Sequence, residues 1–241
     1  MDPRVDKITK ALKDYFVKAD FKKAVIGLSG GVDSALTAKL AVMALGKENV
    51  TALIMPNDGM SSESSVTDAQ AWAEELGIAY EIVPIGDFVG RYKNLPWGES
   101  EAAFINVQAR VRMTILYHFA NSYQAIVLGT DNKTEAILGY FTKYGDGGVD
   151  VLPIASLYKT DVLKIAAALR IPEAILTKAP SAELSKGQKD EDELGMSYKE
   201  VDRILKKFEK GGAARTGDEK KLKARIEANK HKSELAPVIG R

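Results

Sequence analysis

The chain contains no cysteine among its 241 residues. Without thiols it can form neither a disulfide framework nor a thiolate zinc site, and it has no cysteine nucleophile. Its 34 Lys and Arg residues against 33 Asp and Glu residues leave a net charge of +1, whereas nucleic-acid and membrane-surface binding need a basic surplus. No run of about 18 apolar residues and no secretory signal pattern occurs, so we expect a cytoplasmic protein with no nucleic-acid or membrane partner.

Short apolar runs alternate with helical patterns along most of the chain. Buried strands separated by helices of this length pair in parallel through right-handed crossovers. We therefore predict an α/β fold: a Rossmann-like, doubly wound parallel sheet with helices on both faces, which binds ligands at the carboxyl ends of its strands. The predicted strands cover residues 24–28, 50–55, 79–85 and 125–128, and the predicted helices cover residues 35–45, 67–76, 101–120 and 161–169.

The composition changes near residue 185, after which 15 basic and 11 acidic residues follow. Ser197 with Glu200, and Thr216 with Glu219, have the spacing of capping boxes, which predicts two helices. We expect a single domain with an α/β core over residues 1–184 and a charged helical extension over residues 185–241. A solvated helical face is the ordinary interpretation of such charges.

The segment after the first predicted strand, residues 27–34, reads GLSGGVDS. Adjacent glycines let the backbone approach a ligand closely, and the free N–H groups of a following helix favour an anion. The segment is neither a Walker A loop nor a dinucleotide fingerprint, so we interpret it as a phosphate or pyrophosphate loop. A carboxylate beside phosphates needs a cation between them, which makes Asp33 a candidate magnesium ligand. A simple turn with Asp33 as helix N-cap is the alternative.

Charged residues further along the chain have two interpretations each. Arg110 and Arg112 lie in an otherwise apolar helix, where a guanidinium group must meet a substrate anion or an internal salt bridge. Glu135 follows the fourth strand and is either a second magnesium ligand or an exposed acid at a helix start. Residues 143–150, with three glycines, one lysine and two aspartates, form either a substrate loop or a mobile surface loop. Lys159, near a helix start, can face a polyphosphate.

Four segments together carry a resemblance. Residues 29–34 resemble the pyrophosphate-binding loop of the N-type ATP pyrophosphatases. With residues 104–112 (FINVQARVR), 129–135 (GTDNKTE) and 141–150 (FTKYGDGGVD), the chain resembles ammonia-dependent NAD synthetase across essentially its whole length. The last of these segments is not shared by the related GMP, asparagine and argininosuccinate synthetases or by tRNA-thiolating enzymes.

The resemblance implies an adenine nucleotide alpha hydrolase-like fold and a homodimer. It also implies ATP-dependent amidation of deamido-NAD with free ammonia, through an adenylated carboxylate, which yields NAD+, AMP and pyrophosphate. ATP is then a co-substrate and Mg²⁺ the cofactor, and either Asp146 or Asp150 could accept the proton of ammonia. Two alternatives stay open: a GMP-synthetase-like or tRNA-modifying enzyme, and a non-catalytic adenine-nucleotide sensor.

The resemblance also assigns roles to individual residues. It gives ATP binding to Gly27, Leu28, Ser29, Gly30, Gly31, Val32, Asp33, Ser34, Thr130, Lys159 and Ser181. It gives deamido-NAD binding to Arg110, Lys143, Asp150, His231 and Lys232. Asp33 and Glu135 are the implied magnesium ligands and, with Lys159, the implied catalytic residues. From the residues alone, Ser181 would pass as part of a Pro-led turn and His231 as a bystander in a charged tail. After the His-Lys pair the family pattern continues with basic residues and a proline, whereas this chain reads SELAP at residues 233–237.

Overall fold

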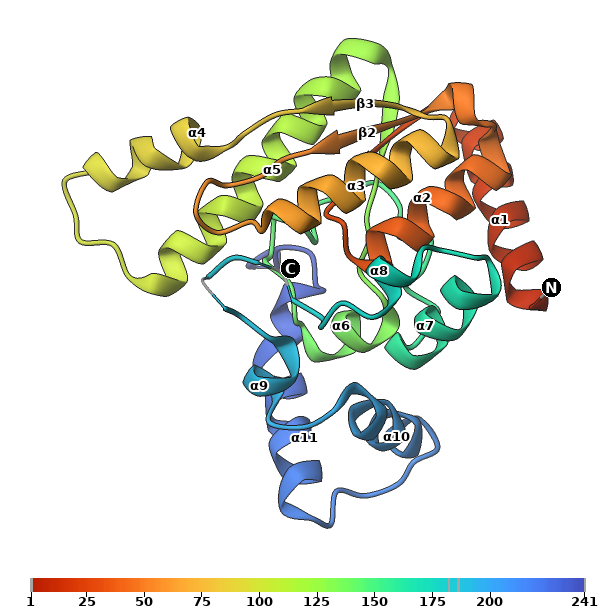
Figure 1. The fold of residues 1–241 in the computed structure, drawn as a ribbon. Helices are drawn as coiled ribbons and strands as arrows, with labels where there is room; N and C mark the ends of the chain where they lie inside the picture. Colours follow the sequence, from red (N-terminus) through yellow and green to blue (C-terminus); the bar gives the residue numbers. More distant parts are fainter. Residues whose placement is uncertain (1, 182, 186, 241) are drawn as a thin grey trace.

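Four parallel strands form the central sheet, in the order β3, β2, β1, β4 (Figure 1). The structure is a computed structural model that describes residues 2–181, 183–185 and 187–240. An isolated parallel bridge between Leu128 and Val151 lies beside the sheet at β4. The strands are β1 (Lys23–Gly27), β2 (Val50–Ile54), β3 (Ala79–Ile82) and β4 (Ala125–Leu128).

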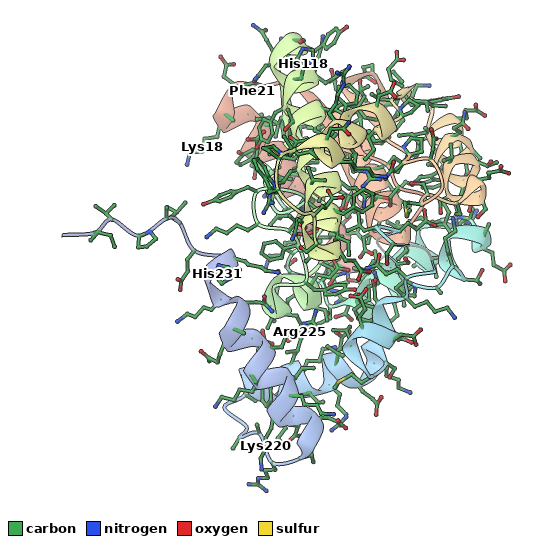
Figure 2. All side chains as sticks on the ribbon, turned by 90° about the vertical axis from the view of Figure 1, so that its left-hand side faces the viewer. Lys18, Phe21, His118, Lys220, Arg225 and His231 are labelled. Atoms are coloured by element: carbon green, nitrogen blue, oxygen red, sulfur yellow. The ribbon has the colours of Figure 1, made fainter. Side chains whose placement is uncertain are left out.

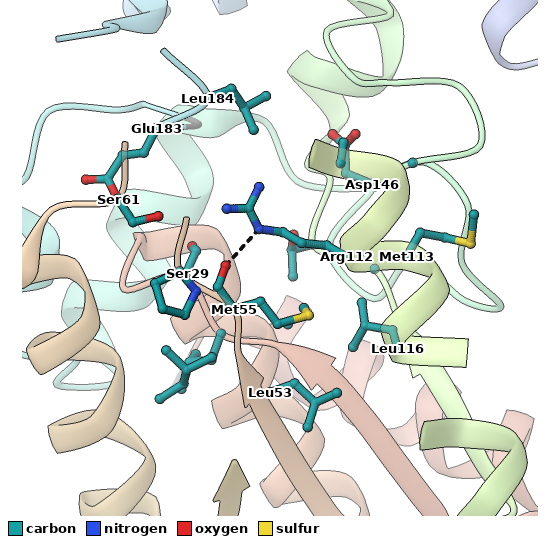
Figure 3. Close-up of a pocket in the computed structure, with 18 of the residues that line it drawn as sticks. Ser29, Leu53, Met55, Ser61, Arg112, Met113, Leu116, Asp146, Glu183 and Leu184 are labelled. Atoms are coloured by element: carbon teal, nitrogen blue, oxygen red, sulfur yellow. Dashed lines mark hydrogen bonds between the residues drawn. The ribbon is translucent and has the colours of Figure 1, made fainter. Parts of the chain in front are cut away.

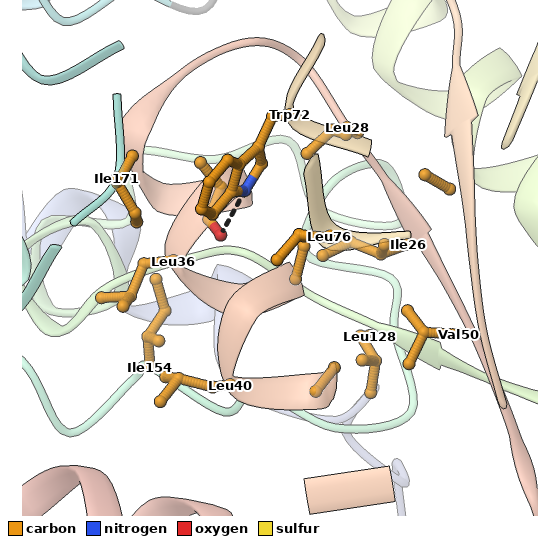
Figure 4. Close-up of a cluster of buried hydrophobic side chains, with 14 of the residues drawn as sticks. Ile26, Leu28, Leu36, Leu40, Val50, Trp72, Leu76, Leu128, Ile154 and Ile171 are labelled. Carbon is orange, nitrogen blue, oxygen red and sulfur yellow. Dashed lines mark hydrogen bonds between the residues drawn. The ribbon is translucent and has the colours of Figure 1, made fainter. Parts of the chain in front are cut away.

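Helices cover both faces of this sheet, which confirms the doubly wound prediction (Figure 1). In β1, Ile26 packs into one apolar cluster and its neighbour Val25 into the other, because successive strand residues point to opposite faces. The larger cluster includes Trp72, whose Nε1 donates to the Ala35 carbonyl oxygen at 3.0 Å and so ties two helices together (Figure 4). The helices on that side are α1 (Pro3–Ala19), α2 (Val32–Leu45), α3 (Glu63–Leu76), α7 (Lys159–Ala168) and α8 (Glu173–Leu176), and those on the other side are α4 (Gly86–Gly90) and α5 (Glu101–Tyr123).

The predicted boundaries differ from the observed ones by a few residues. The helix α2 begins at Val32 rather than at residue 35, because its N-cap is Gly31 of the glycine turn. The helix α3 begins at Glu63 rather than at residue 67, because the Ser62 side chain accepts a hydrogen bond from the Ser65 N–H. Serine is a preferred N-cap residue, so the earlier start has a local cause that the hydrophobic pattern does not show.

The segment after residue 185 forms three further α-helices, which lie below the sheet in Figure 1. The capping boxes predicted at Ser197 and at Thr216 are both present. These helices bury an apolar cluster of their own against α6. The remaining elements are η1 (Lys47–Asn49), η2 (Arg91–Asn94), α6 (Lys133–Leu138), α9 (Asp190–Leu194), α10 (Tyr198–Glu209), α11 (Gly217–Asn229) and η3 (Lys230–Lys232). Within the described ranges, no helix is long and apolar enough to span a bilayer.

Candidate functional site

The glycine turn between β1 and α2 has the geometry of an anion site. The Ser29 and Ser34 hydroxyls lie 3.0 Å apart, and Ser29 Oγ also accepts a hydrogen bond from the Gly31 N–H at 3.2 Å. The first turn of a helix leaves its N–H groups without intrahelical partners, and here that turn comprises Val32, Asp33 and Ser34. These N–H groups and the helix dipole together favour a bound phosphate.

Gly30 is the position of this turn that requires glycine. Its φ is +77°, and a Cβ atom there would lie 2.2 Å from the Ser65 carbonyl oxygen. Side chains are disfavoured at such φ values, and the contact with the start of α3 leaves no space for one. Gly30 therefore packs the turn against α3 and fixes its path.

The three predicted catalytic side chains meet beside this turn. The Lys159 ammonium group contacts the Asp33 carboxylate and lies 3.5 Å from Glu135 Oε1. Asn132 connects the two acids: its Nδ2 donates to Asp33 Oδ1 at 2.9 Å, and its Oδ1 accepts from the Glu135 N–H at 3.1 Å. The structure thus brings together residues 33, 135 and 159, which come from three different helices.

Burial and mutual repulsion govern the charges of this cluster. Burial and the neighbouring Asp33 raise the pKa of Glu135 to about 8. Burial acts to lower the pKa of Lys159, but the two carboxylates outweigh it and raise that pKa above its ordinary value. One ammonium group offsets only one of two carboxylate charges, so the cluster favours a further cation or a proton.

The two carboxylates fit a magnesium ion. Mg²⁺ in phosphate-transfer sites is typically held by one or two carboxylates, with phosphate oxygens and water completing six ligands. Asp33 and Glu135 supply that number next to the glycine turn. Among the described residues, no cluster of three or more His, Asp or Glu side chains is placed to hold a metal by itself, so substrate oxygens would have to complete the coordination.

Two cavities adjoin at the carboxyl ends of β1 and β4. The polar cavity, of about 180 Å³, contains the acid and lysine cluster, and it is also lined by Ser181. The apolar cavity, of about 230 Å³, is lined by side chains such as Met55 and Leu116 (Figure 3). Ser29 and Thr130, both predicted ATP contacts, line both cavities. Pro180, Ser181 and Glu183 line the polar cavity, and Glu183 and Leu184 line the apolar one; Ala182 lies outside the described residues.

Arg112 is the cation of the apolar cavity. Its Nε donates to the Met55 carbonyl oxygen at 3.0 Å, and the rest of its guanidinium group points into the cavity (Figure 3). Burial lowers the pKa of Arg112 to about 10, although Asp146 and Glu183 act in the opposite direction. The internal salt bridge considered for this residue is not found among the ion pairs of the described residues.

Four of the predicted deamido-NAD residues form a second group outside the two cavities. The Lys143 ammonium group donates to the carbonyl oxygen of His231 at 2.5 Å, and an Arg110 guanidinium N–H donates to the Lys143 carbonyl oxygen at 3.4 Å. Lys232 donates to the carbonyl oxygen of Phe141 at 2.9 Å. These contacts hold the C-terminal residues against the glycine-rich loop, and Figure 2 shows the segment after His231 extending away from the body of the protein.

Asp150 lies apart from that group. Its carboxylate accepts hydrogen bonds from Tyr117 Oη at 2.9 Å and from the Val127 N–H at 2.8 Å. Asp146, the other candidate proton acceptor, lines both cavities and accepts from the Thr142 N–H at 2.9 Å. Of the two aspartates, the structure therefore places Asp146 at the cavities and gives Asp150 a role in joining the loop to β4.

Asn132 and Asp131 are polar residues of the site that were not among the sequence-based candidates. Asn132 shows only a helix-cap signal, which gives no hint that its amide reaches Asp33. Asp131 is 6% exposed and lines the polar cavity. Burial and the nearby charges of Asp146, Glu135 and Asp33 raise its pKa well above the ordinary value. Arg112 did show a signal, a cation in an apolar helix, but sequence alone could not choose between it and Arg110.

Comparisons with known proteins point to one family. A family model described as NAD synthase matches residues 4–236. An NH(3)-dependent NAD(+) synthetase of Archaeoglobus fulgidus is 47% identical over 236 residues, which cover 97% of this chain and 95% of that protein. An NMN synthetase structure from Francisella tularensis has a TM-score of 0.91 and 36% identity, and the match covers 99% of this chain and 98% of that one. An NH3-dependent NAD synthetase from Campylobacter jejuni gives a TM-score of 0.85 and 29% identity, with 99% of both chains covered.

Proposed function

This chain belongs to the NAD synthase family, and we propose that it forms NAD+ from deamido-NAD, ATP and ammonia in the site just described. It is a ligase of that family, and its fold is the one that the family shares. The observation that carries the proposal is the polar cavity, where a phosphate-binding turn meets two carboxylates and a lysine. A sensor of adenine nucleotides would have no use for such a cluster.

Different residues of the site contribute to activating the nicotinate carboxylate of deamido-NAD. A carboxylate resists attack by ammonia, so a nicotinate oxygen of deamido-NAD first attacks the α-phosphorus of ATP, and pyrophosphate leaves. Ammonia then attacks the acyl carbon, AMP leaves, and the proton that the nitrogen loses passes to a base, for which Asp146 at the cavities is our candidate. In our proposal the N–H groups of the turn bind the departing pyrophosphate, and Lys159 stabilises the negative charge that it gains.

We propose that Asp33 and Glu135 hold Mg²⁺, which would neutralise charge on the phosphate oxygens. Two carboxylates from different helices, joined through Asn132, support this role. The apolar cavity would take the adenosine part of ATP, since nucleoside sites are mostly apolar with a few polar groups that fix orientation. Arg112 is the group that could fix it, together with Thr130, which lines both cavities. Ser181 lines the polar cavity, where it could reach the phosphates.

The group around Lys143 is our proposed binding surface for deamido-NAD. Arg110, His231 and Lys232 supply cationic or hydrogen-bonding groups within one connected set. Such groups suit the phosphates and the carboxylate of a dinucleotide. Asp150 was also predicted to bind deamido-NAD, but it lies apart from this group and its carboxylate is bonded to Tyr117 and Val127, so we leave it out of the proposed surface.

We also propose that the protein is a homodimer in the cytoplasm. The proposed use of ATP as a co-substrate supports this location. Exposed apolar side chains supply surface for a second copy: Val17 is 74% exposed, Trp97 is 67% exposed and Tyr123 is 55% exposed. Light scattering should then give twice the chain mass of 26.2 kDa, and the mass of one chain would contradict the dimer.

A second substrate deserves a direct comparison, because one similar structure is that of an NMN synthetase. The purified chain should be given ATP, Mg²⁺ and ammonium with either deamido-NAD or nicotinate mononucleotide, and the products AMP, NAD+ and NMN should be measured. We expect equal amounts of AMP and NAD+, and faster turnover of deamido-NAD. Preference for the mononucleotide would change the substrate, whereas activity with xanthosine monophosphate, or nucleotide binding without turnover, would contradict the proposed function.

A further inference from the structure

The helix α10 reaches the catalytic cluster from the C-terminal extension. Its Asp202 is 1% exposed, and its carboxylate accepts three hydrogen bonds. The Thr134 hydroxyl donates at 2.5 Å, and the N–H and hydroxyl of Thr160 donate at 2.9 and 2.6 Å. A buried carboxylate is costly unless it is fully bonded, so these donors and Asp202 are fixed relative to one another.

The two threonines are the chain neighbours of the catalytic groups. Thr134 immediately precedes Glu135, and Thr160 immediately follows Lys159. In addition, the Lys159 N–H donates to the Thr134 hydroxyl oxygen at 3.0 Å. Asp202 therefore holds the starts of α6 and α7 together at the point where each helix presents its catalytic side chain.

Tyr198 lies one helical turn before Asp202, so both side chains lie on the same face of α10. The Lys159 ammonium group is 5.1 Å from the centroid of the Tyr198 ring, close enough for a cation–π interaction. The ring is held in turn by its hydroxyl, which donates to Asp190 of α9 at 3.0 Å, and Tyr140 donates to the same carboxylate at 3.2 Å. Asp190 and Tyr198 are 4% and 3% exposed, so the hydrogen bond that holds the Tyr198 ring is shielded from water.

We propose that Asp202 and Tyr198 are positioning residues of the ligase reaction: Asp202 fixes the backbone that carries Glu135 and Lys159, and the Tyr198 ring confines the Lys159 ammonium group. The inference rests on the proposed function. It makes the C-terminal extension part of the reaction centre, in addition to its charged outer surface. Neither residue needs to touch substrate, because both act through Lys159 and Glu135.

The test compares four variants in the full-length chain. Asp202→Asn removes the carboxylate that bonds Thr134 and Thr160, and Tyr198→Leu removes the ring beside the Lys159 ammonium group. Tyr198→Phe keeps the ring but loses the hydroxyl, and Val201→Ala is the matched control. Val201 is completely buried on the same helix and packs in the apolar cluster that α9, α10 and α11 form against α6. Among the described residues, no hydrogen bond, ion pair or cation–π contact joins its side chain to Lys159 or Glu135. Its truncation should lower the melting temperature without disturbing the catalytic groups.

Displacement of a catalytic group by about 1 Å can cost roughly a hundredfold in rate, so we expect Asp202→Asn to lower kcat by at least about tenfold. Tyr198→Leu should lower kcat by about tenfold and Tyr198→Phe by no more than about threefold, since the ring supplies the cation–π contact. The KM values for ATP and deamido-NAD should change little. Val201→Ala should keep the wild-type kcat despite a lower melting temperature.

The inference would be overturned if folded Asp202→Asn kept the wild-type kcat, or if the two Tyr198 variants had equal kcat. It would also be overturned if Val201→Ala lost kcat in proportion to its loss of stability. The Tyr198 pair decides the matter if Asp202→Asn does not fold. Failure of the proposed function would show as an inactive wild-type chain. In that case crystal structures of Tyr198→Leu and Val201→Ala test the inference. The 3.5 Å contact between Lys159 and Glu135 should be lost in Tyr198→Leu and kept in Val201→Ala. Its presence in both variants would contradict our proposal.

Discussion

The two adjoining cavities differ most in how their charges are held. In the polar cavity, Lys159 contacts both Asp33 and Glu135, and all three residues lie in the first turns of helices. In the apolar cavity, Arg112 is bonded through Nε to a backbone carbonyl and otherwise faces open space. A preorganised set of charges suits a transition state, whereas a single cation in an apolar wall suits ligand orientation. We therefore expect substitutions in the polar cavity to change kcat and substitutions in the apolar cavity to change the KM for ATP.

The largest effect should come from Asp33→Asn. The amide cannot balance a cation or the Lys159 ammonium group as a carboxylate does, so we expect kcat to fall by about a hundredfold or more, with a smaller change in the KM for ATP. Steady-state kinetics and circular dichroism check the result. Asp6→Asn, at an exposed position of α1, is the matched control and should behave as wild type. A kcat near the wild-type value in Asp33→Asn would contradict the expectation that the polar cavity governs kcat.

Arg112→Met tests the other side of the comparison. Methionine keeps the apolar wall but loses a charged hydrogen-bond donor, so the KM for ATP should rise by about tenfold while kcat changes little. Arg110→Met is the control, because Arg110 is exposed and lies on the proposed deamido-NAD surface. It should leave the KM for ATP unchanged. If Arg112→Met instead lowered kcat as Asp33→Asn does, residues of both cavities would take part in the chemical step.

Lys143→Ala probes the surface outside both cavities. Loss of its ammonium group removes the bonds to the His231 and Glu234 carbonyl oxygens and a charge available to substrate phosphate. We expect the KM for deamido-NAD to rise by about five- to tenfold and the KM for ATP to stay near its wild-type value. Kinetics with each substrate varied in turn give the answer, and equal effects on both would contradict the substrate surface.

The smallest effect concerns stability and pH. Burial and Asp33 raise the pKa of Glu135 from its ordinary 4.5 to about 8. The folded protein therefore binds this proton more tightly than the unfolded chain does, so the stabilising contribution is present at low pH and is lost as the pH rises through 8. Without ATP and Mg²⁺, Glu135→Gln should gain a few degrees in melting temperature relative to wild type between about pH 5 and pH 9. A pH-independent difference would contradict the buried, ionisable state of Glu135.

The sequence predicted the fold and the turn because their signals are local. Apolar runs, glycines and helix caps lie within a few residues of one another, and right-handed crossovers place the strands in parallel. The strand order was not predicted and came from the structure. The glycine turn, for which we propose pyrophosphate binding, was found for the same reason, since Gly30, Asp33 and Ser34 share one segment. Boundaries shifted by a few residues where a cap such as Ser62 determined the helix start.

The contacts that complete the site could not be predicted, because they join distant parts of the chain. Lys159 and Asp33 are 126 residues apart in sequence and meet only through the packing of α7 beside α2. Arg110 and Arg112 lie two positions apart on α5 and so point in different directions; only the rotation of that helix decides which faces the cavity. The division of the chain at residues 184 and 185 stays a prediction, although Tyr198 and Asp202 bring the extension to the reaction centre.

A crystal structure with Mg²⁺ and a non-hydrolysable ATP analogue tests the central claim most directly. We predict β- and γ-phosphates bonded to the N–H groups of the turn, in the polar cavity beside Lys159, and an adenine ring in the apolar cavity between Met55 and Leu116. An analogue bound in the opposite orientation, or with its phosphates outside the polar cavity, would contradict the account.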